Sequence, residues 1–148
     1  MQTQLDHRNP TTRHRGATRV LVVDDDRDIR ELLVELLESE HYEVSSACDG
    51  QQALRTFLVQ WPDIILLDLM MPIMSGWQFL HVQAEHPRLA SIPVVVLSAF
   101  DVFDRRMDVA AAVHPKPFLV DEVLDTVHRL AGRVAPWHTC HSLEEKTR

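Results

Sequence analysis

The chain has 148 residues, of which 45% are hydrophobic and 25% charged, and its formal net charge at pH 7 is −7. This length predicts one domain with an apolar core, and the acidic balance argues against a nucleic-acid-binding protein, which normally carries a basic face. No apolar run is long enough to cross a membrane, and the 2 cysteines favour a reduced, cytoplasmic setting over a disulfide framework.

The first expected element is a β-strand at 19–23, after a polar tail over 1–18 that shows no periodicity. A helix follows, with apolar residues at the spacing of one buried stripe. They are Ile29, Leu32, Leu33, Leu36 and Leu37. A more polar strand over 42–47 suits a sheet edge. Asp49 and Gly50 then open a second helix, with the apolar residues Ala53, Leu54, Phe57 and Leu58.

Residues 64–67 predict the most buried strand of the chain, which ends on Asp68. A third helix is expected around Trp77, Leu80 and Val82. A fourth buried strand over 92–97 precedes Ser98, a helix is expected over roughly 101–112, and a very short strand near 113–114 precedes Lys116. The last helix has apolar residues at helical spacing, namely Val120, Val123, Leu124, Val127 and Leu130.

Strands and helices thus alternate five times, which is typical of βαβ units in a parallel sheet with helices on both faces. We predict an α/β protein with a flavodoxin-like, doubly wound (βα)5 fold and a five-stranded parallel sheet of order 2-1-3-4-5. This domain spans 19–132. The residues 133–148 are too few for a second domain and are expected to form a C-terminal tail.

Polar side chains follow the carboxyl ends of these strands. Asp24 and Asp25 close the first strand and Asp68 closes the third, and these two strands flank the switch point of the predicted order. Adjacent strands lie about 5 Å apart, so the three carboxylates should converge. Oxygen ligands of this kind favour Mg²⁺ (or Mn²⁺). Lys116 lies about 10 Å from Asp68 by strand count, a span that its side chain largely covers.

This arrangement suits phosphoryl transfer, which depends mainly on positioning and charge neutralisation. A carboxylate such as Asp68 is a competent nucleophile. The cation and Lys116 would neutralise phosphoryl oxygens, and the Ser98 hydroxyl could donate a hydrogen bond to one of them. In a simpler interpretation, the acids after the first strand only cap a helix, and Asp68 is only a turn residue. This interpretation does not explain why these residues are placed together.

Four segments match one known family in its own order. They are Val22–Asp26, Leu66–Pro72 with Gly76, Leu97–Ala99 and Lys116–Phe118. Over about residues 18–131 the sequence resembles the receiver domain of two-component response regulators, here of the stand-alone type. The resemblance implies five roles. These are the phosphoacceptor (Asp68), the acidic metal-binding pair (Asp24 and Asp25), a further metal ligand (the backbone carbonyl of Met70), the switch hydroxyl (Ser98) and the phosphate-contacting lysine (Lys116).

The resemblance also implies partners. The phosphoryl donor would be a sensor histidine kinase or a histidine phosphotransfer protein, and the output would be altered binding of a downstream protein, with a homodimer as one assembly that the family allows. On this interpretation the protein is a cytoplasmic signalling phosphoacceptor that catalyses only its own phosphorylation and dephosphorylation, with neither nucleic acid nor membrane among its partners.

Several features depart from the family pattern. Only 18 positions separate Ser98 from Lys116, so the fourth helix or its flanking loops should be shortened. Val113 stands where an aromatic switch residue is usual, so Phe100 or Phe103 would have to take over that role. Pro115 removes a donor from the fifth strand, which an edge strand tolerates. Met70, beside the acceptor, should position attacking water poorly, and we therefore expect slow hydrolysis of the phosphoryl group.

Three alternative interpretations of the sequence compete with this one. A phosphohydrolase of the haloacid dehalogenase type needs a second acid two residues after its nucleophile, and this chain has Met70 there. A receiver-like interaction domain that does not switch stays open, because the segment between Ser98 and Lys116 departs from the pattern. A zinc site at His138–His141 lacks a fourth ligand at a usual spacing.

Overall fold

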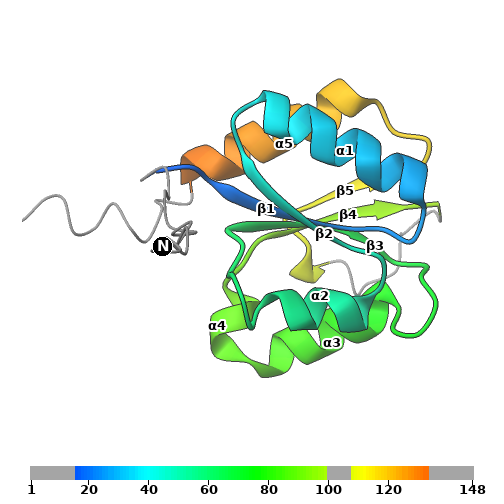
Figure 1. The fold of residues 1–148 in the computed structure, drawn as a ribbon. Coiled ribbons are helices and arrows are strands. Elements are labelled where there is room, and N and C mark those ends of the chain that lie inside the picture. The colour runs from blue at the N-terminus through cyan, green and yellow to red at the C-terminus, as the bar shows by residue number, and fades with distance from the viewer. Residues whose placement is uncertain (1–15, 100–107, 134–148) are drawn as a thin grey trace, which may run out of the picture.

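The computed structural model describes residues 16–99 and 108–133. A parallel sheet in the order β2-β1-β3-β4-β5 forms its middle layer (Figure 1). The strands are β1 (Arg19–Val23), β2 (Glu43–Ala47), β3 (Ile64–Asp68), β4 (Val94–Ser98) and β5 (Ala112–Pro115). The order and the parallel pairing confirm the predicted fold class, with the polar β2 at one edge and β5 at the other.

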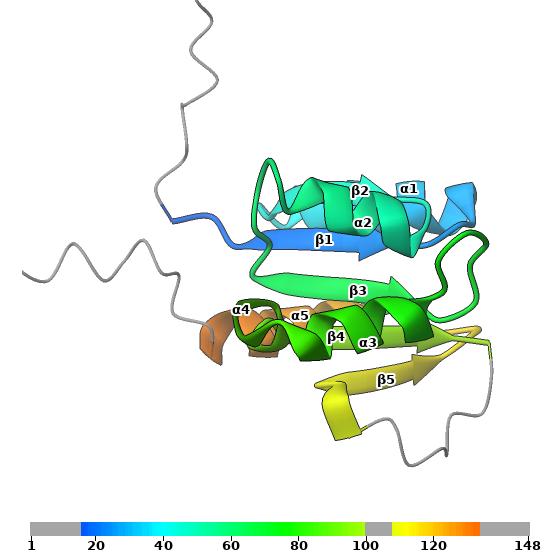
Figure 2. The same cartoon turned by 90° about the horizontal axis from the view of Figure 1, so that it is seen from below.

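Helices cover both faces of the sheet, as Figures 1 and 2 show. One face carries α1 (Arg27–Ser39) and α5 (Val120–Arg133), and the other carries α2 (Gly50–Thr56), α3 (Gly76–Glu85) and α4 (Pro87–Ala90). Each face has its own apolar cluster, and β3 supplies both because its side chains alternate between them. Every residue of β3 is buried, which confirms it as a central strand.

Helix starts near the sheet's carboxyl edge are fixed by side-chain caps. The Asp26 carboxylate accepts hydrogen bonds from two backbone N–H groups of α1, and the Asp49 carboxylate accepts one from the backbone N–H of Gln52 in α2. The hydroxyl of Ser75 and the amide of Gln78 form a reciprocal capping box at the start of α3. These caps fix the loops that leave β1, β2 and β3.

Two helix predictions need correction. The expected stripe of α1 is buried at Leu33 and Leu37, but Leu32 is 45% exposed. Leu32 lies about 100° around the helix from Leu33, at the margin of the stripe. The second helix was expected to include Phe57 and Leu58, but α2 ends at Thr56. Phe57 turns into the core, whereas Leu58 is 87% exposed.

The region around β4 and β5 also differs from expectation. The short helix α4 was not predicted, although Pro87 stands at its first turn, where proline fits well. The strand expected from 92 starts at Val94, just after Pro93. The helix expected over 101–112 falls largely outside the described residues, but its end is wrong, because 108–109 form a short 3₁₀ turn and Ala112 already belongs to β5.

Candidate functional site

The candidate site lies at the carboxyl edge of the sheet, where three neighbouring strands end side by side. The register pairs Val23 of β1 with Leu67 of β3, so the residues that follow them, Asp24 and Asp68, reach the same rim. On the next strand, Ser98 follows the residue that pairs with Asp68. Parallel pairing therefore brings together acids that are far apart in the sequence.

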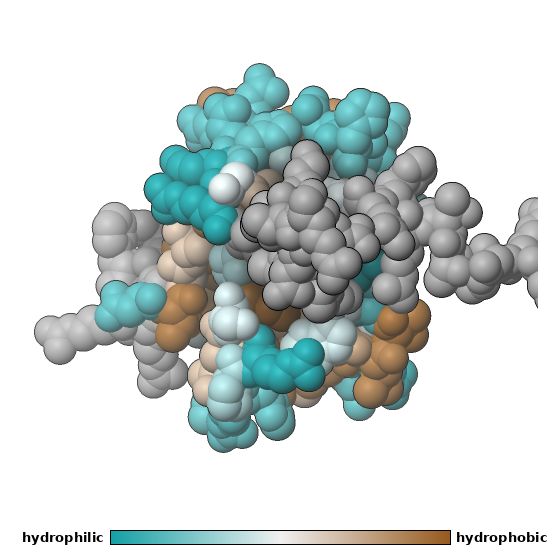
Figure 3. Space-filling view, turned by 90° about the vertical axis from the view of Figure 1, so that its left-hand side faces the viewer, coloured by the Kyte–Doolittle hydropathy of each residue, from teal (hydrophilic) through white to brown (hydrophobic). Residues whose placement is uncertain are grey.

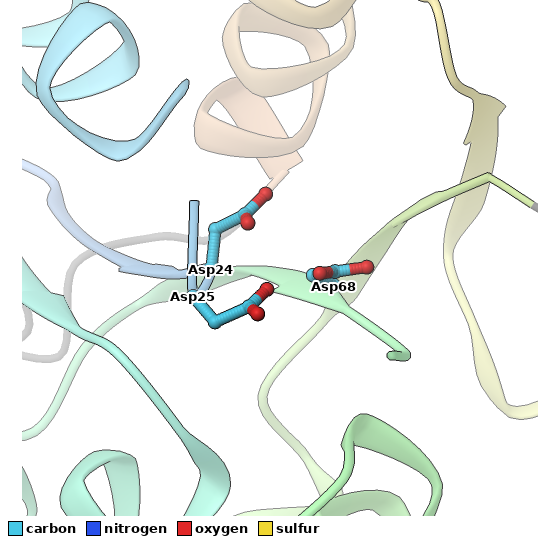
Figure 4. Close-up of side chains that lie close together, drawn as sticks. All are labelled: Asp24, Asp25 and Asp68. Atoms are coloured by element: carbon cyan, nitrogen blue, oxygen red, sulfur yellow. The ribbon is translucent and has the colours of Figure 1, made fainter. Parts of the chain in front are cut away.

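Three carboxyl groups face one shared space at this rim, as Figure 4 shows for Asp24, Asp25 and Asp68. One oxygen from each lies within 4.8 Å of the others. Asp24 is 1% exposed and Asp68 4%, while Asp25 is open to solvent. Like charges this close are unfavourable unless a cation joins them or one of them holds a proton. The predicted convergence of these carboxylates is thus present in the structure.

Lys116 supplies a positive charge to the same cluster. Its Nζ donates a hydrogen bond to Asp24 Oδ2 at 2.8 Å and lies 3.6 Å from Asp68 Oδ2. Burial of the ammonium opposes its charged form, but the hydrogen bond and charge of Asp24, together with Asp68, outweigh burial and raise the pKa of Lys116. The ammonium is therefore held charged against the acids.

Asp68 is the most perturbed acid of the described residues. Burial, followed by the negative charge of Asp24, raises the pKa of Asp68 to about 6. Lys116 and a hydrogen bond from the Met70 backbone N–H to Asp68 Oδ1, at 3.3 Å, act in the opposite direction. A carboxyl group that is hard to ionise alone favours a bound cation, and perturbed groups of this kind mark functional sites.

The loop after β1 is fixed by contacts that the sequence did not predict. The backbone N–H of Asp26 donates to Asp24 Oδ1 at 2.9 Å, and Arg30 Nη1 donates to the carbonyl oxygen of Asp24 at 2.8 Å. Arg30 thus ties the first turn of α1 to the buried acid. The sequence does indicate that Arg30 could make this contact, because Arg30 stands four residues after the helix cap Asp26 and so lies near the start of α1.

The loop after β3 packs closely against the acceptor strand. The Gly76 N–H donates to the carbonyl oxygen of Leu69 at 3.0 Å. A Cβ atom at Gly76 would lie 2.2 Å from the carbonyl oxygen of Asp68, which no real Cβ approaches. Glycine is therefore needed here because the backbone of α3 touches the backbone of β3.

Ser98 and Lys116 lie at neighbouring strand ends. Ser98 is fully buried, and its carbonyl oxygen accepts a hydrogen bond from the Lys116 backbone N–H. The peptide bond between Lys116 and Pro117 is cis. Phe100 and Phe103, named as alternative switch residues, lie outside the described residues, as does the segment His138–His141.

The donor set at this rim fits a hard divalent cation. The three carboxylates offer only oxygen atoms, and no histidine or cysteine joins the cluster among the described residues. Mg²⁺ and Mn²⁺ prefer such ligands, and a site of this kind uses one or two carboxylates together with water and phosphate oxygens. The Met70 backbone carbonyl stays a predicted further ligand.

Comparisons with known proteins agree on one family. A family model described as the response regulator receiver domain matches residues 20–127. The response regulator MprA of Mycolicibacterium vanbaalenii is 36% identical over 126 residues, which are 80% of this chain and 52% of MprA. The response regulator PleD of Caulobacter vibrioides is 45% identical over 85 residues, 57% of this chain and 19% of PleD. The match therefore spans about half of the length of MprA and 19% of the length of PleD.

Solved structures share the fold over most of the described chain. The receiver domain of the Francisella response regulator 1452 is 29% identical with a TM-score of 0.71, and the match covers 78% of this chain and 98% of that one. The response regulator TrrA of Thermotoga maritima, solved in complex with Mg(2+)-BeF, is 33% identical with a TM-score of 0.69, covering 76% and 98%. Among the helices of 16–99 and 108–133, none has the length and apolar character that a membrane crossing requires.

Proposed function

Because the chain belongs to the response regulator receiver domain family, we propose that it is the phosphoacceptor module of a two-component phosphorelay. Asp68 accepts the phosphoryl group, with Mg²⁺ or Mn²⁺ held by Asp24, Asp25 and Asp68 and by the Met70 carbonyl. One observation carries the proposal: three carboxylates and the Lys116 ammonium converge on one rim, around the most perturbed acid. The Mg(2+)-BeF complex of TrrA adds support from a relative.

The transfer step follows from the positions of these groups. A carboxylate oxygen of Asp68 attacks the phosphorus of a phosphohistidine, the P–N bond breaks, and its electron pair stays on the imidazole nitrogen. An acyl phosphate results. With its Nζ 3.6 Å from Asp68 Oδ2, Lys116 is within reach of an oxygen of the incoming group. The Ser98 hydroxyl is proposed to donate a hydrogen bond to a second phosphoryl oxygen. The divalent cation, when bound, neutralises charge on the phosphoryl oxygens.

The family implies a histidine kinase as partner, and the finer assignments are proposals. We place the protein in the cytoplasm, where it takes its phosphoryl group from a sensor histidine kinase or a histidine phosphotransfer protein and alters the binding of a downstream protein. The family is one of signalling modules, and we propose that the only reactions this chain catalyses are its own phosphorylation and dephosphorylation.

A receiver-like interaction domain that does not switch is the second candidate. Val113 favours it, because this β5 residue is 36% exposed and has no ring with which to report on Ser98. In that case the chain would bind its partner equally well with and without phosphoryl donor.

Incubation with acetyl phosphate and Mg²⁺, followed by intact-mass measurement, tests the proposal. We expect the mass of one phosphoryl group to be added to the wild-type chain and to be absent from Asp68→Asn. Asp28→Asn is the matched control, because Asp28 is exposed and lies outside the acidic cluster. A wild-type chain that stays unmodified, or an Asp68→Asn chain that is still modified, contradicts the assignment.

A further inference from the structure

An apolar groove lies at the edge of the molecule where the strands begin, opposite the acidic rim. It runs between the end of α2 and the short helix α4 and has a volume of about 390 Å³. Its lining residues are Leu54, Phe57, Leu58, Trp61 and His86–Leu89. Figure 3 views this edge. Brown apolar side chains gather in its lower half, on the side of α2, α3 and α4, whereas the upper half over α1 and α5 is mostly teal.

One lining side chain of this groove is unusually exposed for its type. Leu58 is 87% exposed, and the next residue in the chain, Val59, which does not line the groove, is 90% exposed. They follow directly after Phe57, a buried lining residue whose ring packs edge-on against Trp61. Two neighbouring aliphatic side chains beside an apolar depression are typical of interaction sites. Removing aliphatic side chains from water is favourable, so an occupant that covers them would be stabilised.

The groove also carries a positive charge that nothing in the described ranges neutralises. The guanidinium of Arg88 lies over the Trp61 ring, 4.7 Å from its centroid. Among the described residues no carboxylate forms an ion pair with Arg88, and no acidic residue lines the groove. This local charge contrasts with the net charge of −7 of the whole chain.

We propose that this groove is a docking site for an acidic peptide segment of a partner protein. The segment inserts a bulky apolar side chain against Leu54 and Leu58 and places a carboxylate on Arg88. Charge complementarity selects this occupant, because a basic segment would be repelled by the same guanidinium and a purely apolar one would leave it without a counter-charge. The site does not depend on phosphoryl transfer at Asp68.

Two synthetic peptides test the inference on the full chain. The first is fluorescein-labelled Glu-Glu-Leu-Leu-Phe-Glu-Glu, and the second has lysine in place of each glutamate. We expect fluorescence anisotropy to show binding of the acidic peptide about tenfold tighter than of the basic one. In ¹H–¹⁵N spectra, the Trp61 indole signal and the backbone signals of Leu58 and Leu89 should shift with the acidic peptide.

Charge reversal makes the test specific. Arg88→Glu should invert the preference, so that the lysine peptide becomes the tighter ligand, and Leu58→Ser should weaken both peptides about tenfold. Leu32→Ser and Arg27→Glu are matched controls, because Leu32 and Arg27 are exposed on α1, on the other face of the sheet. Thermal melting of each variant shows that it folds.

Three results would overturn the inference. The first is equal or absent binding of the two peptides by the wild-type chain at millimolar concentration. The second is a charge preference that Arg88→Glu leaves unchanged. The third is a concentration-dependent dimer in sedimentation that Leu58→Ser abolishes, which would assign the groove to a second copy of this chain.

Discussion

The balance of charge around Asp68 is decided by two residues of opposite sign. Asp24 is almost completely buried and makes ionisation of Asp68 unfavourable, whereas the Lys116 ammonium favours it. Lys116 is closer to Asp24, at 2.8 Å, than to Asp68, at 3.6 Å. Lys116 therefore offsets only part of the unfavourable effects at Asp68, where burial, followed by the negative charge of Asp24, raises the pKa to about 6.

This balance predicts how stability depends on pH without metal. The Asp68 carboxyl loses its proton near 3.8 in the unfolded chain and near 6 in the folded one, so the folded protein binds the extra proton between these values. The free energy of unfolding therefore falls as the pH rises through this window. Asp68→Asn should stabilise the metal-free chain by about 2 kcal/mol at pH 7 and have no effect below pH about 4.

Urea denaturation in EDTA at a series of pH values measures this effect. Asp28→Asn serves as the control, because its carboxylate is exposed and stands apart from the cluster. A gain in stability that is the same at acidic and neutral pH would show that charge at Asp68 is not its cause.

Met70 predicts a long-lived phosphoryl group. Its side chain is 53% exposed beside the acceptor and has no hydrogen-bonding group to orient an attacking water molecule. After acetyl phosphate is removed, the phosphorylated chain should decay slowly, and Met70→Asn should accelerate the decay about tenfold. Intact-mass measurement over time follows the loss of the phosphoryl group from the wild-type chain and from Met70→Asn. Complete decay of the wild-type chain within seconds would count against the prediction.

The convergence of Asp24, Asp25, Asp68 and Lys116 could be predicted from the sequence for a simple physical reason. Each lies at or just after the carboxyl end of a strand of a parallel sheet, and the ends of parallel strands share one edge. Two contacts could not be predicted from the sequence: the hydrogen bond from Lys116 to Asp24 and the hydrogen bond from Arg30 to the Asp24 carbonyl oxygen. Both depend on loop geometry within a few tenths of an ångström.

At the scale of elements, prediction succeeded where burial was uniform and failed at element ends. β3 and β4 are buried along their whole length, so a short apolar run identified them. α2 ends at Thr56, two residues before the end of its apolar pattern at Leu58, and of the two residues beyond it Phe57 is buried in the core whereas Leu58 is exposed. The sequence pattern identifies apolar residues, but it does not show which of them pack against the core. α4 has only four residues, too few to show a period.

The contact between α3 and β3 gives a prediction at this scale. A methyl group at Gly76 would overlap the backbone of Asp68 and Leu69, so Gly76→Ala must displace the end of the acceptor strand. We expect a loss of about 2 kcal/mol or more in the free energy of unfolding and weaker phosphorylation. Gly132→Ala is the control. Its added Cβ meets nothing within 4 Å in α5, so it should stabilise the chain by up to about 1 kcal/mol. Similar denaturation midpoints for the two variants would contradict this account.

At the scale of the whole molecule, the sheet order decides both the core and the site. β1 and β3 are adjacent in space but separated in sequence by α1, β2 and α2, and their pairing places the acids of both strands together. The alternation of short apolar runs and helical patterns was sufficient to predict this arrangement, because few topologies satisfy right-handed crossover connections.

Metal binding at this junction should stabilise the entire fold. A cation that binds only the folded chain adds about 2.7 kcal/mol at a concentration one hundred times its dissociation constant. Thermal melting in MgCl₂ should therefore occur at a higher temperature than in EDTA, and Asp25→Asn should lose most of the increase. Asp25 is exposed, so its replacement should leave the melting temperature in EDTA nearly unchanged. An equal increase in both chains would place the ion elsewhere.

The acidic rim and the apolar groove lie at opposite edges of the sheet, separated by the length of the strands. Each strand of five residues extends about 17 Å. A protein bound over Asp68 would therefore leave the far edge uncovered, and the two surfaces could be occupied at once. The domain would then act as an adaptor that holds a phosphoryl donor and an unrelated acidic protein in one ternary complex. The acidic protein would be brought close to the donor without competing for the surface around Asp68.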